Sequence, residues 1–325
     1  FPTRRSSDLY HHMEEFRRGG DLLNRPPHEA NVAEQTEHSI NGGGLKFDYF
    51  SPNENHRFNV FASAQHINRD SYYGPGDRDP LDAYGNTTDL NWMAGSQYVY
   101  SFGKCIFMPS DLTAGIEFNQ DKLEDNMWGY NRTVDQKVNI GSAFLQNEWK
   151  NDHWGFLIGG RLDKHNLIDH VIFSPRANLR YNPTENINLR FSYSSGFRAP
   201  QAFDEDLHVE NVGGNVAMVE LADNLKEERS QSLSASADIY HRFGAFQVNF
   251  LVEGFYTKLS DVFALTDGEV VDGILTRTRH NASGAQVLGL TLEGKMAYLN
   301  KIQVQAGVTL QQSHYSKPHI WNKEA

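Results

Sequence analysis

Apolar and polar residues alternate along several long segments of this chain. In 187–197 the odd-numbered positions up to Tyr193 are apolar, whereas the even-numbered positions up to Ser194 are Asn, Arg and Ser. Side chains of a β-strand point alternately to opposite faces, so the pattern predicts a sheet with one apolar and one polar face. The same alternation returns in 173–181, 246–253 and 302–310.

The length of these segments separates a membrane barrel from a soluble sheet. The predicted strands that contain them have about ten residues or more, whereas strands of globular proteins usually have about five to six. Long strands with one apolar face and one polar, partly charged face are typical of a transmembrane β-barrel, which meets lipid outside and water inside. The alternation therefore predicts an all-β protein that forms a transmembrane antiparallel β-barrel.

Short and long connections alternate between the predicted strands. The short ones carry the turn formers Asn, Asp, Pro and Gly, and the long ones lie at 72–89, 122–137, 198–228 and 260–284. A long polar stretch, 10–36, precedes the first clear strand. Outer-membrane barrels have short periplasmic turns and long extracellular loops, which is the same asymmetry. We predict about twelve strands, at roughly 37–50, 56–72, 89–103, 111–122, 138–150, 154–165, 170–181, 187–197, 229–242, 245–259, 285–299 and 301–315.

Aromatic residues gather close to the short connections. In a barrel they would form a girdle at the periplasmic interface, where an aromatic ring contacts both lipid and headgroups. Ordinary aromatic residues at the strand ends of a soluble sheet are the alternative. The residues are Tyr49, Phe50, Tyr100, Phe102, Trp149, Trp154, Tyr181, Tyr240, Phe243, Phe246 and Tyr298.

Composition excludes several other classes of protein. The chain is 39% hydrophobic, its mean hydropathy is -0.59, and it contains no apolar run long enough for a transmembrane helix, which needs roughly eighteen residues. A barrel needs no such run, because every second residue faces water. The net charge of -11 argues against nucleic acid as a partner. The single Cys105 excludes a disulfide framework and a cysteine zinc site.

The first nine residues are set apart from the rest. Residues 1–9 look like the translation of a short-read sequencing adapter, and a basic native tail is the alternative. We therefore predict a non-native segment at 1–9 and a partial barrel over 10–325, and we leave 1–9 out of the fold prediction.

Three motifs in chain order resemble TonB-dependent outer-membrane receptors. The first is Phe197-Arg198-Ala199-Pro200, which follows a strand, a short turn and a second strand. The second, 222–230, includes Asn224 and Leu225 but has Asp223 and Glu227 where that family usually has proline. The third runs through 256–261 and 281–293. The resemblance covers nearly the whole of 10–325.

The resemblance implies a fold and a set of partners. The family's barrel has about twenty-two strands around a plugged lumen, so about twelve strands form a partial wall. We expect the plug domain, the segment that pairs with TonB and the earliest strands upstream, and the last strand beyond residue 325. The implied location is the outer membrane of a Gram-negative bacterium, with lipid and the TonB complex as partners. The implied ligand is an iron chelate of a siderophore, haem or a corrinoid.

Ligand binding is predicted in the connection 198–228, because long loops on a rigid scaffold are where recognition usually resides. His208 is a candidate axial ligand of haem. The Phe-Arg-Ala-Pro motif also occurs in receptors for siderophores and corrinoids, and His208 follows an acidic run, so the ligand class stays open. No resident cofactor or metal site is predicted. The candidate ligand-binding residues are Arg198, Asp204, Glu205, Asp206, His208 and Met218.

Enzyme motifs such as a nucleophile elbow, a zinc-binding His-Glu-x-x-His or a phosphate loop are absent from the sequence. We therefore predict a transporter that binds and gates. A passive porin is the main alternative, and an outer-membrane hydrolase is a third class. Charged residues on the predicted inner face would line the ligand path or form a solvated wall: Arg161, Asp163, Arg176, Arg190 and Glu253.

Overall fold

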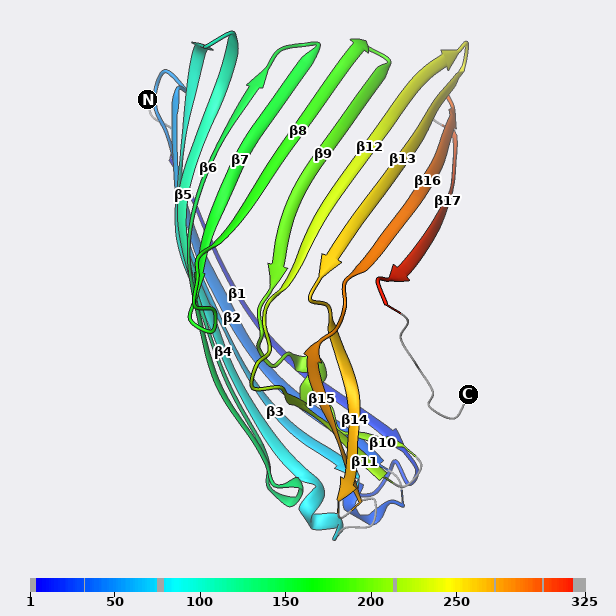
Figure 1. Cartoon of the computed structure of the whole chain (residues 1–325). Coiled ribbons are helices and arrows are strands. Elements are labelled where there is room, and N and C mark those ends of the chain that lie inside the picture. Colours follow the sequence, from blue (N-terminus) through cyan, green and yellow to red (C-terminus); the bar gives the residue numbers. More distant parts are fainter. Residues whose placement is uncertain are drawn as a thin grey trace.

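The computed structural model describes residues 4–31, 33–74, 79–212, 215–271, 273–299 and 301–317. These residues form a curved antiparallel sheet of thirteen strands, the barrel wall, and a smaller four-stranded sheet at one end of it (Figure 1). Neighbouring strands of the wall are joined in the order β1-β2-β3-β4-β5-β6-β7-β8-β9-β12-β13-β16-β17. Among the described residues β1 and β17 do not pair with each other, so this sheet is open.

Each of the twelve predicted strands corresponds to a strand of the wall. The turn that joins β8 to β9 is short, as predicted from its Asn and Pro residues, and so are the turns that join β2 to β3 and β6 to β7. The wall strands are β1 (Arg4–Gly20), β2 (Ala33–Phe50), β3 (His56–Gly74), β4 (Tyr84–Cys105), β5 (Met108–Met127), β6 (Arg132–Lys150), β7 (Trp154–His165), β8 (Ile172–Thr184), β9 (Ile187–Arg198), β12 (Glu228–Phe243), β13 (Phe246–Ser260), β16 (Ala285–Tyr298) and β17 (Ile302–Tyr315).

Two connections predicted as long loops are wrong, because they are largely strand. β5 and β6 stay paired from Lys122 and Lys137 to the short 3-10 helix η3 (Trp128–Tyr130), and β3 and β4 continue toward η2 (Pro80–Ala83). The apolar pattern marks the strands of this wall where their outer face meets lipid. Beyond the membrane the outer face carries polar residues, and the buried inner face mixes apolar residues such as Met127 with charged ones such as Asp125, so the backbone ladder continues while the alternation stops.

The polar stretch 10–36, to which no strand was assigned, is strand in its first part. β1 pairs with β2 from Arg4↔Tyr49 to Gly20↔Ala33. No apolar alternation marks the end of this strand, because the charged residues Glu14, Glu15, Arg17 and Arg18 occupy both of its faces. Residues 1–3 lie outside the described residues, and the adapter origin of 1–9 stays a prediction.

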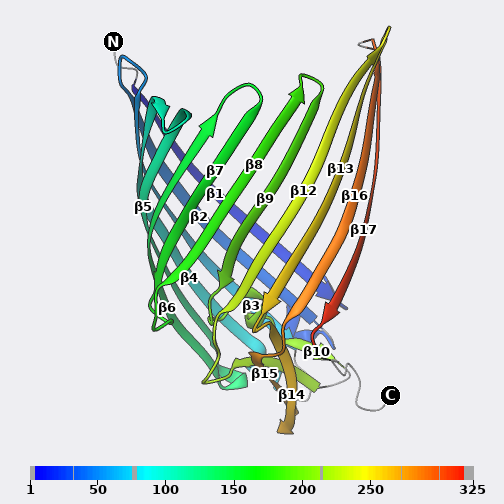
Figure 2. The ribbon, with the colours of Figure 1, turned by 45° about the horizontal axis from the view of Figure 1, so that its top comes forward.

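The two longest connections fold into the smaller sheet. The connection after β9 contains α1 (Asp204–Leu207), β10 (Glu210–Val212) and β11 (Asn215–Leu221), and the one after β13 contains β14 (Phe263–Val271) and β15 (Ile274–Asn281). The strand order is β10-β11-β15-β14, so the two connections meet where β11 lies parallel to β15. β14 and β15 extend beyond the wall strands β13 and β16 (Figure 2).

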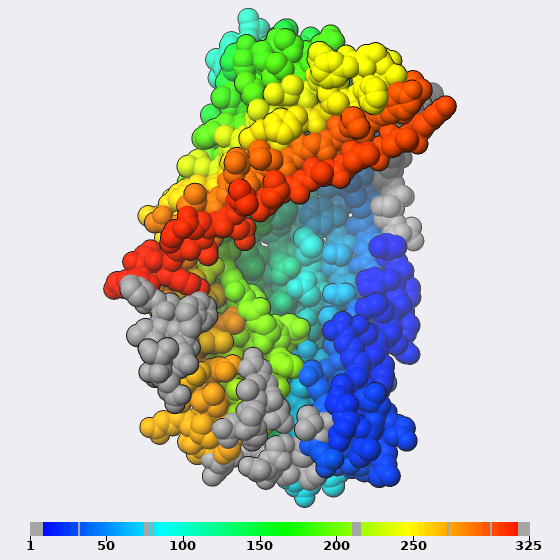
Figure 3. All heavy atoms as spheres, turned by 90° about the vertical axis from the view of Figure 1, so that its right-hand side faces the viewer, coloured from blue at the N-terminus to red at the C-terminus, as the bar shows by residue number. Residues whose placement is uncertain are grey.

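The two faces of the wall differ as the alternation predicts. Apolar side chains on the outer face are exposed, for example Phe191, Phe250 and Leu290. Figure 3 shows the open side, with the inner surface visible between the red β17 and the blue β1. The main buried cluster lies at the end of the wall that carries the long connections and comprises Ala30, Ala33, Tyr72, Tyr73, Ala83, Met127, Tyr130, Val209, Val216 and Met218.

Among the described residues, no helix is both long and apolar enough to cross a membrane.

Candidate ligand-capture site

The connection between β9 and β12 folds back against the inner face of the wall. The Gln136 side chain of β6 donates to the Ala202 carbonyl (3.2 Å) and accepts from the Ala202 N–H (2.7 Å). His165 of β7 lies 3.3 Å from the Gln201 amide oxygen. Leu207 is buried. The connection is therefore held by the barrel at several points.

A buried ionic cluster on the wall supports the end of α1. The Asp125 carboxylate accepts hydrogen bonds from Arg132 (2.8 Å) and Thr87 (2.6 Å), and Arg69 lies 3.8 Å from it. Arg132 also donates to the Leu207 carbonyl at 2.8 Å. Breaking a buried ion pair generally costs about 3 to 5 kcal/mol, because it leaves one charge without a partner. This cluster fixes where α1 ends over the wall.

Arginines neutralise the acidic run at α1. Asp204 pairs with Arg69 of β3 at 2.7 Å, so it joins the connection to the opposite part of the wall. Glu205 accepts from Arg198 at 2.6 Å, and this hydrogen bond holds the pKa of the Glu205 carboxyl below its usual value. Burial raises the pKa of Asp206, the third member of the run.

A polar hollow of about 390 Å³, called here the loop hollow, lies between α1 and the inner face of β1, β2 and β3. His208 Nδ1 is 3.6 Å from the Glu34 carboxylate, and the His208 ring lies edge-on to Tyr73 with 5.1 Å between ring centres. Side chains that converge in this way can orient a polar ligand. The lining residues are Arg17, Arg18, Gly19, Glu34, Thr36, His38, Arg69, Tyr73, Asp204 and His208.

The predicted ligand-binding residues occupy three different places. Asp204 and His208 line the loop hollow. Arg198, Glu205 and Asp206 take part in ion pairs and ring contacts that involve the β13–β16 connection. Met218 is buried in the main cluster beside Val216.

The residues of the first two motifs are spread around the same connection. Ala199 is buried in a small cluster with Ile168 and Ile172, against which Phe197 packs. Pro200 borders a separate cavity of about 650 Å³ that also reaches β6 and β11. Asn224 and Leu225 lie in the turn before β12, where the Leu225 N–H donates to the Ala222 carbonyl at 3.0 Å.

Sequence analysis missed Arg17, Arg69 and Tyr73 as site residues. Arg17 lies in the polar stretch 10–36, to which no strand was assigned. Tyr73 lies in 72–89, which was predicted as a long connection. Arg69 is one of many charged residues on the inner face. Which of them meets the connection depends on where its chain folds, and alternation carries no signal for that.

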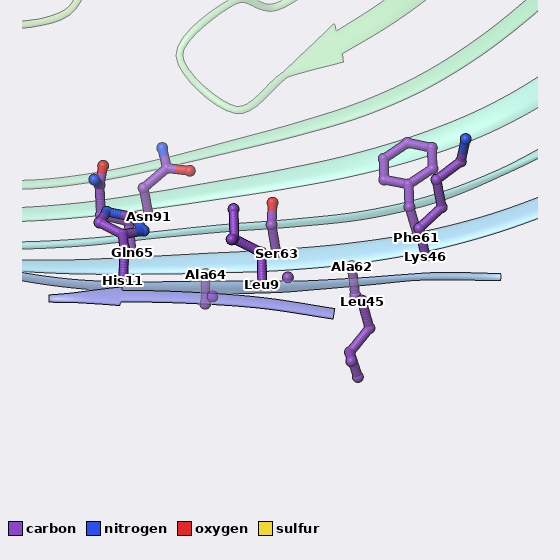
Figure 4. Close-up of a pocket in the computed structure, with 12 residues that line it drawn as sticks. Leu9, His11, Leu45, Lys46, Phe61, Ala62, Ser63, Ala64, Gln65 and Asn91 are labelled. Atoms are coloured by element: carbon purple, nitrogen blue, oxygen red, sulfur yellow. The ribbon is translucent and has the colours of Figure 1, made fainter. Parts of the chain in front are cut away.

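A second hollow lies on the wall itself, among residues of β1, β2 and β3 such as His11, Leu45 and Phe61 (Figure 4). Its volume is about 480 Å³. The His11 ring lies where a Cβ on Gly42 would stand, so this glycine makes room for the ring. Its lining combines small residues such as Ala62 with larger ones such as Leu9 and Phe61, its exposed lining is mostly apolar, and no residue of α1 lines it. The loop hollow is therefore the stronger candidate for ligand capture.

Comparison with known proteins identifies the family of this wall. The family described as TonB dependent receptor-like, beta-barrel, matches residues 6–323. The chain belongs to this family. It is accordingly an all-β protein of the outer membrane of Gram-negative bacteria, so the predicted fold class and location are confirmed. Members of the family are transporters rather than enzymes. No curated protein matches the chain by sequence.

Solved structures of low sequence identity share the fold. The siderophore receptor PirA from Pseudomonas aeruginosa is 13% identical with a TM-score of 0.59, over 96% of this chain and 66% of that one. The outer membrane transporter YddB from Escherichia coli is 11% identical with a TM-score of 0.68, over 96% and 46%. The alcaligin outer-membrane receptor FauA from Bordetella pertussis is 14% identical with a TM-score of 0.61, over 99% and 52%. The chain thus spans about half to two-thirds of the length of these structures.

Proposed function

We propose that this wall belongs to a receptor that captures a scarce ligand outside the cell and transports it actively. The ligand would be a ferric siderophore, haem or a corrinoid, and the energy would come from the TonB complex through a plug domain. Family membership supports this proposal, and so do the names of two structures with the same fold, a siderophore receptor and an alcaligin receptor.

The observation that carries the proposal is the folded connection between β9 and β12. It lies over the inner face of the wall, it is held there by a hydrogen bond from the buried Arg132 and by the Arg69–Asp204 ion pair, and it borders the loop hollow together with β1, β2 and β3. A passive porin would share the alternating wall. The family match therefore favours a receptor over a porin.

The geometry favours a division of roles among the predicted residues. We assign Asp204 and His208 to ligand contact, because both line the loop hollow. We assign Arg198, Glu205 and Asp206 to holding the connection through their ion pairs, and Met218 to its packing, because none of them lines the loop hollow.

Deleting residues 201–221 in the full-length receptor tests the capture site. We expect growth that depends on a limiting iron chelate or corrinoid to be lost, while the amount of receptor in the outer membrane stays normal. His170→Ala is a control, since its exposed side chain contacts Glu227 and Arg229 outside the loop hollow. Undiminished growth of the deletion strain would place capture elsewhere on the extracellular side.

His208→Ala then separates the ligand classes. If haem is the substrate and His208 its axial ligand, growth on haemin should need at least about tenfold more haemin, because a metal–imidazole bond is lost. Growth on a ferric hydroxamate or a ferric catecholate should then be unaffected. If haemin is shown to be the substrate and the variant grows on it normally, His208 is not the ligand.

A further inference from the structure

The two longest connections share one sheet, although a hairpin of the wall separates them in sequence. β11 pairs in parallel with β15 from Val216↔Ile274 to Leu221↔Arg279. Beyond these strands, the Ala222 N–H donates to the Arg279 carbonyl at 2.9 Å. The backbone ladder thus ties the connection that borders the loop hollow to one that does not.

Further contacts join the roots of the same two connections. The Lys226 N–H donates to the Asn281 side-chain oxygen at 2.7 Å, and the Asn281 amide donates back to the Lys226 carbonyl at 3.0 Å. The Phe263 N–H donates to the Glu228 carboxylate at 2.9 Å. These contacts lie where both connections leave the wall, so each connection supports the base of the other.

Arg279 makes two side-chain ion pairs between them. It is only 6% exposed, at the end of β15. Its guanidinium lies 2.5 Å from Asp206 and 3.1 Å from Glu205, both in α1 of the other connection. A buried guanidinium without such partners would be costly, so Arg279 and α1 require each other in this arrangement.

Two aromatic rings lie beside the same ion pairs. The Arg198 guanidinium is 3.9 Å from the Phe203 ring centre and 5.5 Å from that of Phe263. Arg279 lies 5.7 Å and 5.9 Å from the same two ring centres. A guanidinium over an aromatic face is attracted to it, and the attraction is larger where water is excluded. One ring comes from each connection, so both cations contact both connections.

We propose that Arg279 is a positioning residue that locks the β9–β12 and β13–β16 connections into one unit. Arg279 itself lines neither the loop hollow nor the second hollow, which includes Gly43 and Gly44 of β2. It acts through Asp206 and Glu205, which set the position of α1 and hence of Asp204 and His208. The consequence for ligand capture rests on the proposed function, whereas the locking itself does not.

Hydrogen exchange on the full-length receptor tests the lock without any ligand. In Arg279→Met, amides of 201–221 should exchange at least about tenfold faster than in the wild type, while amides of the wall strands β7, β8 and β9 stay unchanged. Arg279→Lys should lie between the two, because it keeps a charge but loses the planar fork. Arg277→Met is the matched control, since Arg277 lies two residues earlier on β15 and pairs at 3.0 Å with the exposed Asp267.

The lock must also act in the opposite direction. Asp206→Asn, a change in the β9–β12 connection, should speed exchange at 274–281 in the β13–β16 connection. The inference is overturned if 201–221 is unaffected in Arg279→Met, if Arg277→Met has an equal effect, or if Asp206→Asn leaves 274–281 unchanged.

Uptake separates this inference from the proposed function. One outcome is that exchange at 201–221 accelerates in Arg279→Met while uptake is undiminished for whichever ferric siderophore, haemin or cobalamin the wild type accumulates. In that case the lock is correct and capture by this connection is not. If uptake falls in Arg279→Met with no change in exchange, the lock is refuted.

Discussion

At the scale of single residues, the acidic run at 204–206 illustrates what side chains do in this connection. Three consecutive acidic residues suggest a surface that binds a ligand, yet each is paired with an arginine from another element. His208 and Asp204 were predicted as ligand-binding residues from their place in a long connection, and both line the loop hollow. The arginines that pair with the acidic run come from β3, β9 and β15, and only the folded chain brings these together.

The lowered pKa of the Glu205 carboxyl predicts that the stabilisation of α1 in its position depends on pH. Its carboxyl pKa is lowered by the hydrogen bond from Arg198 and by Arg279. A lowered pKa in the folded state means that this stabilisation is present above the ordinary glutamate pKa and is lost as the pH falls through the lowered value. At pH 7, Glu205→Gln should show faster exchange at 201–221 than the wild type. Compared at equal pH, the difference should shrink as the pH falls below the ordinary glutamate pKa of about 4.3 and vanish below the lowered pKa.

The same comparison contains its own check. Asp206, whose pKa is raised by burial, titrates in both proteins. Its effect therefore largely cancels when the variant and the wild type are compared. A difference that persists unchanged at low pH would show that the Glu205 charge does not hold the connection.

At the scale of elements, alternation predicted the strands well where the wall meets lipid and poorly beyond it. β7 was predicted with its observed bounds, Trp154–His165. β5 and β6 extend further than predicted, because their outer faces are polar there and their buried inner faces include Asp125 and Arg132, which leaves no period-two signal. β11 and β15 were missed, since their parallel pairing depends on where two separate connections meet.

The alternation on β13 gives a test of which face meets lipid. Phe250 lies on the outer face and is 47% exposed, whereas Asn249 hydrogen-bonds to Asp238 on the inner face. Phe250→Arg should destabilise the folded receptor in a bilayer by about 2 kcal/mol or more, because a charge enters hydrocarbon. Asn249→Arg, at nearly the same depth, should cost much less. Unfolding in urea from lipid vesicles gives both values, and equal costs would contradict the assignment of faces.

At the scale of the whole molecule, the barrel class followed from the sequence and the shape of its extracellular end did not. Strand length and alternation were enough to predict a membrane barrel, because both are local properties of the chain. The loop hollow needs β1, β2 and β3 together with α1, which lies more than a hundred residues further along the chain. Contacts at that separation leave no periodic trace in the sequence.

Transport driven by TonB is the central claim, and its energy dependence tests it most directly. The measurement is accumulation of ⁵⁵Fe or ⁵⁷Co by starved cells that express the full-length receptor, with and without TonB. The probes are ferric complexes of a hydroxamate, a catecholate and a carboxylate siderophore, haemin and cobalamin. We predict saturable accumulation of one class of probe that disappears when TonB is deleted. Non-saturable entry of several unrelated probes, unchanged without TonB, would indicate a passive porin and contradict the account.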